Sequence, residues 1–217
     1  MSGVLYTCGI LACIAGVIAG IRLMNSPRTA VVGNLLGACA LGMGVLLTLV
    51  REGLITHPLV WGALLLSIVL GGALAFVVKT IQMPQTVGLL NGLGGAASAL
   101  VGLAILLGNN DAYASERGAS VLALIVGGIT FSGSLAAAGK LSGILAQKPV
   151  HVPNYRFIAS TLVVILVAAL AWLTLVATPV VAVTAMLIAL VLGLLFAIRI
   201  GGADMAINLS LFNSLSG

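Results

Sequence analysis

The chain contains seven long apolar runs, each of which is long enough to cross a lipid bilayer as one helix. A helix rises about 1.5 Å per residue, so about 20 apolar residues span the roughly 30 Å hydrocarbon layer. Short segments between the runs carry nearly all of the charged residues and most of the prolines. The runs lie at about 3–24, 31–50, 59–78, 84–108, 119–139, 157–177 and 179–198. The sequence therefore predicts an all-α integral membrane bundle of seven transmembrane helices.

The two ends of the chain add to this prediction. The first run has no basic flank and no small-residue cleavage site, so we expect a spanning helix and not a cleaved signal peptide. A partial eighth helix is expected over 205–217, because this segment is compatible with a helix but ends at Gly217. A chain that stops inside a spanning helix is typical of a truncated protein. We expect residues 1–217 to form a single transmembrane domain.

The composition excludes most soluble functions. Apolar residues make up 61% of the chain and charged residues 6%, far from the values of soluble domains. The net charge of +5 is spread over the turns without a basic cluster, so nucleic acid is not an expected partner. Cys8, Cys13 and Cys39 lie inside apolar runs without metal-ligand spacing, and no metal site is predicted.

The basic residues predict the orientation of the chain, because positive charge is enriched in cytoplasmic loops. Arg51 and Arg117 fall in the turns that follow even-numbered runs. The N-terminus is therefore predicted to lie outside, with the odd-numbered turns in the cytoplasm. Asp204 is then the only carboxylate on the cytoplasmic side. The basic residues of the odd-numbered turns are Arg22, Arg28, Lys79, Lys140, Lys148, Arg156 and Arg199.

The run 84–108 combines small residues with two polar ones. The small residues are spaced by three and four positions, which forms a groove where another helix can approach closely. Asn91 and Ser98 lie on the same side as this groove. Because an unpaired amide in hydrocarbon costs several kcal/mol, Asn91 should face protein or a water-filled gap. It either bonds two helices together or belongs to a polar path through the membrane. The small residues are Gly88, Gly92, Gly95, Ala96 and Ala99.

The same run contains a match to the dinucleotide-binding pattern G-x-G-x-x-A at 92–97, with Asp111 at about the usual distance. That fingerprint requires a strand before it and an amphipathic soluble helix after it. Here a continuous apolar run surrounds the glycines on both sides, so the context excludes a nucleotide site.

Three stretches together resemble the membrane-spanning part of the β subunit of proton-translocating NAD(P) transhydrogenase. In chain order they cover essentially the whole sequence. In that family the complete subunit resembles this chain extended by further spanning helices and a soluble NADP(H)-binding domain. The stretches are Gly71–Gly102, with its Q-M-P turn; Gly127–Pro153, with T-F-S-G-S and G-K-L; and Ile200–Gly217, with G-G-A-D-M and L-F-N-S.

The resemblance implies a function, which is proton passage through a membrane domain coupled to hydride transfer between NAD(H) and NADP(H). Hydride transfer takes place on soluble domains, so it implies that this chain binds no cofactor, while NAD and NADP serve the complete enzyme. The implied partners are the transmembrane helices of the α subunit, the soluble NAD(H)- and NADP(H)-binding domains, the lipid bilayer and a second copy in a homodimer. The implied location is the cell inner (plasma) membrane.

The resemblance also implies which residues form the proton path. Asn91 stands where many members have a histidine proposed to relay the proton, and an amide cannot change its charge at neutral pH. Either a helix of the partner subunit supplies the relay group, or water held by Asn91 carries the proton. The other matched positions are Asp204 at the cytoplasmic mouth, Asn213 in the channel, Ser132 and Ser134 on a flanking helix, and Lys140 closing the path at the cytoplasmic surface.

Two alternative functions remain open. A half-permease for a small solute also shows glycine-interrupted helices and amides at mid-depth, and an inverted repeat would favour it. We find no such repeat in the sequence. A structural membrane-anchor subunit would need neither a polar face on 84–108 nor an isolated carboxylate beside two glycines.

Overall fold

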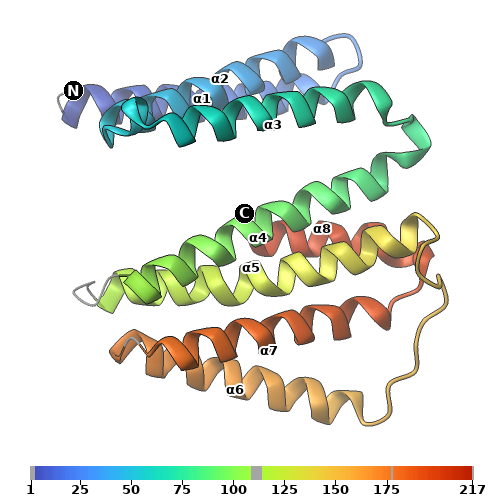
Figure 1. Cartoon of the computed structure of the whole chain (residues 1–217). Coiled ribbons are helices and arrows are strands. Elements are labelled where there is room, and N and C mark those ends of the chain that lie inside the picture. The colour runs from blue at the N-terminus through green and yellow to red at the C-terminus, as the bar shows by residue number, and fades with distance from the viewer. Residues whose placement is uncertain (1–2, 109–113, 177, 217) are drawn as a thin grey trace. The chain divides into compact units, whose positions relative to one another are not determined.

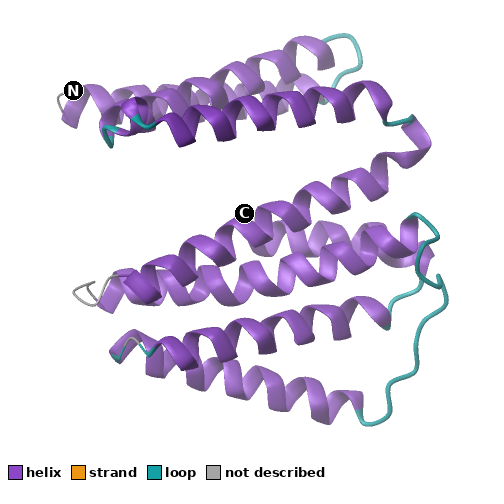
Figure 2. Cartoon of the chain, viewed as in Figure 1, coloured by secondary structure: helices purple, strands orange, loops and turns teal. Residues whose placement is uncertain are grey.

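The computed structural model describes residues 3–108, 114–176 and 178–216. Every regular element in these ranges is a helix (Figure 2). Seven of the described helices are long and apolar enough to cross a membrane, and a short eighth helix follows them. The predicted all-α membrane fold is therefore confirmed.

The observed helices follow the apolar runs closely, and the largest difference is at the start of the fifth. There the helix begins at Ala114, because Ser115, Glu116 and Arg117 form a polar first turn. An acidic residue in the first turn favours this start through the helix dipole. The helices are α1 (Gly3–Met24), α2 (Ala30–Arg51), α3 (Pro58–Val77), α4 (Met83–Gly108), α5 (Ala114–Leu141), α6 (Tyr155–Leu175), α7 (Pro179–Ile198) and α8 (Met205–Ser216), with short 3₁₀ turns η1 (Leu54–Thr56), η2 (Thr80–Gln82) and η3 (Gly202–Asp204).

The chain divides into two units, Met1–Val77 (unit 1) and Val78–Gly217 (unit 2). Unit 1 holds α1, α2 and α3, and unit 2 holds α4 to α8 (Figure 1). Each unit is described by itself below. The grouping of both into a single transmembrane domain stays a prediction.

In unit 1, α1 and α2 pack against each other through a pair of glycines. A Cβ atom on Gly20 would lie 2.7 Å from the carbonyl oxygen of Gly33, and one on Gly33 would lie 2.6 Å from that of Gly20. The two backbones are therefore in direct contact. Near the other end of the pair, the Arg51 guanidinium lies 4.5 Å from the centre of the Tyr6 ring. The third helix of the unit, α3, has no buried residue in the described chain.

In unit 2, α5 is the central helix and contacts α4, α6, α7 and α8. It presents a different glycine to each of three neighbours, because a side chain at any of these positions would press against the facing helix. α5 can therefore approach several helices closely at once. The contacts are Gly127 with the α4 backbone at Gly95, Gly128 with Ala189 of α7, and Gly133 with Phe212 of α8.

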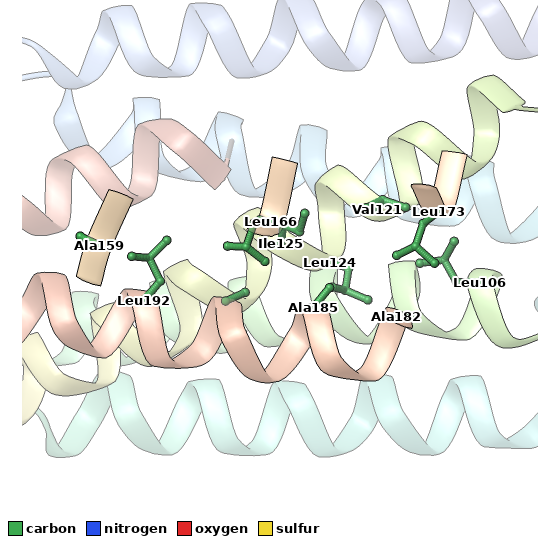
Figure 3. Packing of buried hydrophobic residues seen from close by; sticks show 11 residues of the cluster. Leu106, Val121, Leu124, Ile125, Ala159, Leu166, Leu173, Ala182, Ala185 and Leu192 are labelled. Carbon is green, nitrogen blue, oxygen red and sulfur yellow. The ribbon is translucent and has the colours of Figure 1, made fainter. Parts of the chain in front are cut away.

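The apolar core of unit 2 lies between α4, α5, α6 and α7. Leucine and isoleucine side chains from α4, α5 and α6 meet alanines of α7, and Figure 3 shows them converging. Alanine on α7 keeps the helices close while leucine fills the space between them. The cluster consists of Leu106, Val121, Leu124, Ile125, Ala159, Leu166, Leu173, Ala182, Ala185, Ala189 and Leu192.

Candidate functional site

The interface between α4 and α5 is built from backbone and very small side chains. A Cβ atom on Gly95 would lie 2.8 Å from the carbonyl oxygen of Gly127 and 2.8 Å from the amide nitrogen of Phe131. Gly88, Gly92, Gly95 and Ala99 are all buried on this side of α4. The small-residue groove predicted from the spacing is therefore present, and α5 occupies it.

One hydrogen bond between side chains crosses this interface. The amide nitrogen Nδ2 of Asn91 donates to the hydroxyl oxygen Oγ of Ser134 over 2.9 Å. Asn91 is half-buried, and Ser134 is fully buried. Because the glycines bring the backbones together, two short polar side chains can reach each other across the contact. The structure thus joins two of the predicted site residues that are 43 positions apart.

Helix α8 covers the same part of the interface. A Cβ atom on Gly88 would lie 3.2 Å from the side chain of Leu209, and one on Gly133 would lie 2.6 Å from the Phe212 ring. Asn208 belongs to this buried face of α8, with 8% of its surface exposed. On this face Asn208 stands next to Leu209, which packs in a buried cluster with Ala137 of α5, and one turn before Phe212.

Three buried side-chain atoms have no hydrogen-bond partner within the described ranges: Nε of Arg117, at the start of α5, and two atoms near the α4–α5–α8 contacts. The latter two are the amide nitrogen Nδ2 of Asn208 and the hydroxyl oxygen Oγ1 of Thr130, whose side chain is 1% exposed. The Cβ atom of Thr130 lies 2.9 Å from the Cβ position of Gly95, so its side chain is in the α4–α5 interface. We call Asn91, Thr130, Ser134 and Asn208 the polar seam.

The remaining predicted site residues lie outside the polar seam. The hydroxyl of Ser132 donates to the carbonyl oxygen of Gly128 in its own helix over 3.1 Å. It faces α7, because a side chain on Gly193 would collide with it. Asp204, in η3, and Asn213, on α8, are exposed. The structure therefore brings Asn91 and Ser134 together and places the other three elsewhere, and the roles of all five stay predictions.

Lys140 lies at the end of α5, where the sequence places it, but its side chain is buried. Only 2% of Lys140 is exposed. Its ammonium nitrogen Nζ donates to the carbonyl oxygen of Ile198 over 2.6 Å and to that of Ile200 over 2.8 Å. The lysine therefore contacts the end of α7 instead of reaching the surface.

Sequence reasoning did not select Thr130 and Asn208 as site residues. Each is a polar residue inside a largely apolar segment, as Asn91 is, but each stands among other polar residues, Thr130 near Ser132 and Asn208 near Ser210. The helical spacing of Met205, Asn208, Leu209 and Phe212 defines one face of α8, and that face is the buried one. Only the packing of α8 on α5 shows which face turns inward.

Comparison with known proteins identifies the family. The family model described as NAD(P) transhydrogenase beta subunit matches residues 6–217. The chain belongs to this family. Two curated relatives, each named NAD(P) transhydrogenase subunit beta and coming from Rhodospirillum rubrum and a strain of that species, are 36% identical to it. Each match covers 94% of this chain and 46% of the relative, so the chain spans about half the length of these relatives.

Membership of the transhydrogenase beta-subunit family confirms the resemblance found in the sequence. The three stretches that carry the resemblance all lie within the matched range, from residue 6 to residue 217. The spanning-length helices agree with a multi-pass membrane protein. All four residues of the polar seam also lie within the matched range.

Proposed function

We propose that this chain forms part of the proton path of an NAD(P) transhydrogenase and couples proton passage to hydride transfer between NAD(H) and NADP(H). Family membership supports the enzyme, and the polar seam supports the path. The observation that carries the proposal is the Asn91–Ser134 hydrogen bond, which stands beside two unpartnered polar groups in the interface of α4, α5 and α8. Polar groups at such depth are costly and are retained mainly where they serve function.

The chemistry of the seam suits water binding. Asn91 donates to Ser134, which leaves the carbonyl oxygen of Asn91 as an acceptor and the Ser134 hydroxyl hydrogen as a donor. Thr130 and Asn208 add one hydroxyl and one amide donor. A buried water typically makes about three hydrogen bonds to such groups. The proton would then cross either on water held by the seam or on an ionisable side chain that a partner helix inserts beside Asn91.

Coupling requires a gate as well as a path. The nucleotide state of the soluble domains must change which end of the path is open, so at least one element needs two arrangements. Asp204 is exposed in η3 and can exchange protons with water at the mouth, while Asn213 and Ser132 would flank the route. We place the gate at α8, because its buried face packs over the α4–α5 interface at Gly88 and Gly133.

The proposal includes the partners and the location. Soluble domains would bind NAD(H) and NADP(H), and the transmembrane helices of the α subunit would complete the path in an assembly that forms a homodimer. The protein would lie in the inner membrane with its N-terminus outside and the α5–α6 turn in the cytoplasm. Basic residues at Lys140, Lys148 and Arg156 around that turn support this orientation.

Asn91→Leu in the assembled transhydrogenase tests the path. Proton pumping in vesicles should fall by about tenfold, equivalent to about 1.4 kcal/mol on the limiting barrier, because leucine excludes water and cannot bond Ser134. The cyclic reaction, in which hydride returns to the same bound NADP(H) without proton passage, should be preserved. Ser98→Ala, seven residues along the same helix, is the control and should pump normally. Unchanged pumping in Asn91→Leu would leave α4 with a structural role only.

Cysteine labelling tests the orientation. Single cysteines at Ser115 and Gln147, both exposed, would be introduced in a background that lacks the three native cysteines. An impermeant thiol reagent should label Ser115→Cys only from outside the cell and Gln147→Cys only from the cytoplasmic side. Labelling with the opposite sidedness would reverse the proposed orientation.

A further inference from the structure

Three segments that are far apart in the sequence meet at one end of unit 2. They are the end of α5, the turn between α5 and α6, and the junction between α7 and α8. The amide of Val150 donates to the carbonyl oxygen of Ile198 over 3.0 Å, and the amide of Gly202 donates to that of Gln147 over 2.9 Å. Lys140 donates to the same Ile198 carbonyl and to Ile200. Four hydrogen bonds therefore join these segments, and Lys140 makes two of them.

Because Lys140 is buried, its ammonium group depends on these two carbonyl oxygens for hydrogen bonds. An ammonium group removed from water is costly unless its donors are bonded, and two of its three N–H donors reach carbonyl oxygens here. Ile198 is the last residue of α7, so its carbonyl belongs to the negative end of the helix dipole and has no partner within the helix. The positive charge and the helix end therefore compensate each other.

The side chain of Lys140 is shielded from water, and an apolar cluster lies beside it in the sequence and at Ile200. Ala137, Met205 and Leu209 form a buried apolar cluster, with Leu141 and Ile200 packed against it. Electrostatic hydrogen bonds are stronger in such an environment than in water. Any displacement of the α7–α8 junction from the end of α5 would thus leave a buried ammonium unpaired.

We propose that Lys140 is a positioning residue that clamps the α7–α8 junction to the end of α5 and thereby sets the position of Asp204 and of the first turn of α8. Asp204 follows the clamped carbonyl of Ile200 by four residues, and its own amide donates to Gly201 over 3.1 Å. Because α8 begins immediately after Asp204, the clamp also fixes where α8 begins relative to the end of α5. This inference rests on the proposed proton path, in which α8 acts as the gate.

The test uses Lys140→Met in the assembled enzyme, because methionine keeps much of the chain length and removes the charge and the donors. Proton pumping relative to the cyclic reaction should fall by about tenfold. The matched control is Lys148→Met, which removes the same charge from an exposed position in the neighbouring turn and should pump normally. A lysine that serves folding alone would lower the amount of enzyme without changing this ratio.

An engineered disulfide makes the test reversible in protein that has already folded. A Cβ atom on Gly202 would lie 3.2 Å from the Cβ atom of Gln147, close to the roughly 3.5–4.5 Å of a disulfide. The pair Gln147→Cys and Gly202→Cys, without the native cysteines, should cross-link readily when Lys140 is present and several-fold more slowly in Lys140→Met. Oxidation should restore pumping in Lys140→Met, and reduction should abolish it again.

Normal pumping in Lys140→Met beside a defective Asn91→Leu would overturn the clamp and leave the proposed path standing. A disulfide that forms without restoring pumping would also overturn it. If neither Lys140→Met nor Asn91→Leu loses pumping, both the proposed function and the clamp are wrong. If Lys140→Met does not accumulate in the membrane, Val150→Pro replaces it as the test, because proline removes another hydrogen-bond donor to Ile198. Cross-linking and pumping should both fall by about twofold. Unchanged cross-linking and pumping in Val150→Pro would overturn the clamp.

Discussion

Unit 1 and unit 2 bring helices together in the same way but differ in what their interfaces contain. Gly20 and Gly33 hold α1 and α2 in backbone contact, as Gly95 and Gly127 hold α4 and α5. Yet in the described chain the buried polar side chains all belong to unit 2. They are Ser120, Thr130, Ser134, Lys140 and Asn208.

This difference separates packing from function. Small residues allow close contact wherever helices associate in lipid, so a glycine pair by itself does not indicate a path. A buried polar group costs stability unless it is bonded. Three of the five buried polar residues, Thr130, Ser134 and Asn208, lie on the packed faces of α5 and α8, and such a concentration favours a role beyond packing. By this criterion we propose unit 2 as the region of the proton path, and the α1–α2 pair of unit 1 as a packing contact.

The largest effect is expected from Gly95→Leu, which breaks the contact that forms the polar seam. A leucine there would overlap the backbone at Gly127 and Phe131, and overpacking typically costs about 1–3 kcal/mol or more. The assembled complex recovered from membranes should fall by about tenfold. Gly94→Leu is the matched control, since a side chain on Gly94 meets nothing within 4 Å. Equal losses in both variants would contradict the assignment of the packing face.

A smaller effect is expected from Asn208→Leu. This change removes one buried polar side chain of unit 2 and leaves the helix packing in place, so it tests whether polarity distinguishes unit 2 from unit 1. Leucine has the same branching and number of side-chain heavy atoms as asparagine and needs no hydrogen bond, so the complex should assemble normally. Pumping should fall by about fivefold, or about 1 kcal/mol, because one donor of the seam is lost. Ser210→Ala, at an exposed position of the same helix, should have no effect. Normal pumping in Asn208→Leu would remove this residue from the seam.

The smallest effect on coupling is expected from Gly20→Leu in unit 1. The leucine would overlap the carbonyl of Gly33, so the amount of enzyme should fall by about twofold as α1 and α2 separate. The ratio of pumping to the cyclic reaction should not change, because no buried polar group among the described residues depends on this contact. Gly37→Leu, whose side chain would meet nothing within 4 Å, is the control. A changed ratio would show that unit 1 also takes part in coupling.

Some features of the site were predictable because they depend on neighbours along one helix. The spacing of small residues placed a groove on one side of α4 and put Asn91 on that side, and both are observed. The partner across the groove was not predictable in this way. Ser134 was chosen through a family resemblance together with Ser132, and only the packing of α5 shows that one faces α4 and the other α7.

The sequence by itself determined the membrane class, the number and approximate bounds of the helices, and the family. Hydropathy and helical period are properties of single segments, so they need no knowledge of what each segment contacts. Only the tertiary structure decided that α5 is the central helix, that Asn208 and not Asn213 turns inward, and that Lys140 is buried at the end of α7. These outcomes depend on contacts between residues that are far apart in the sequence. Lys140 and Ile198, for example, are 58 positions apart. In lipid such contacts are chosen by shape and by hydrogen bonding between helices, since the seven long helices are all apolar enough to span.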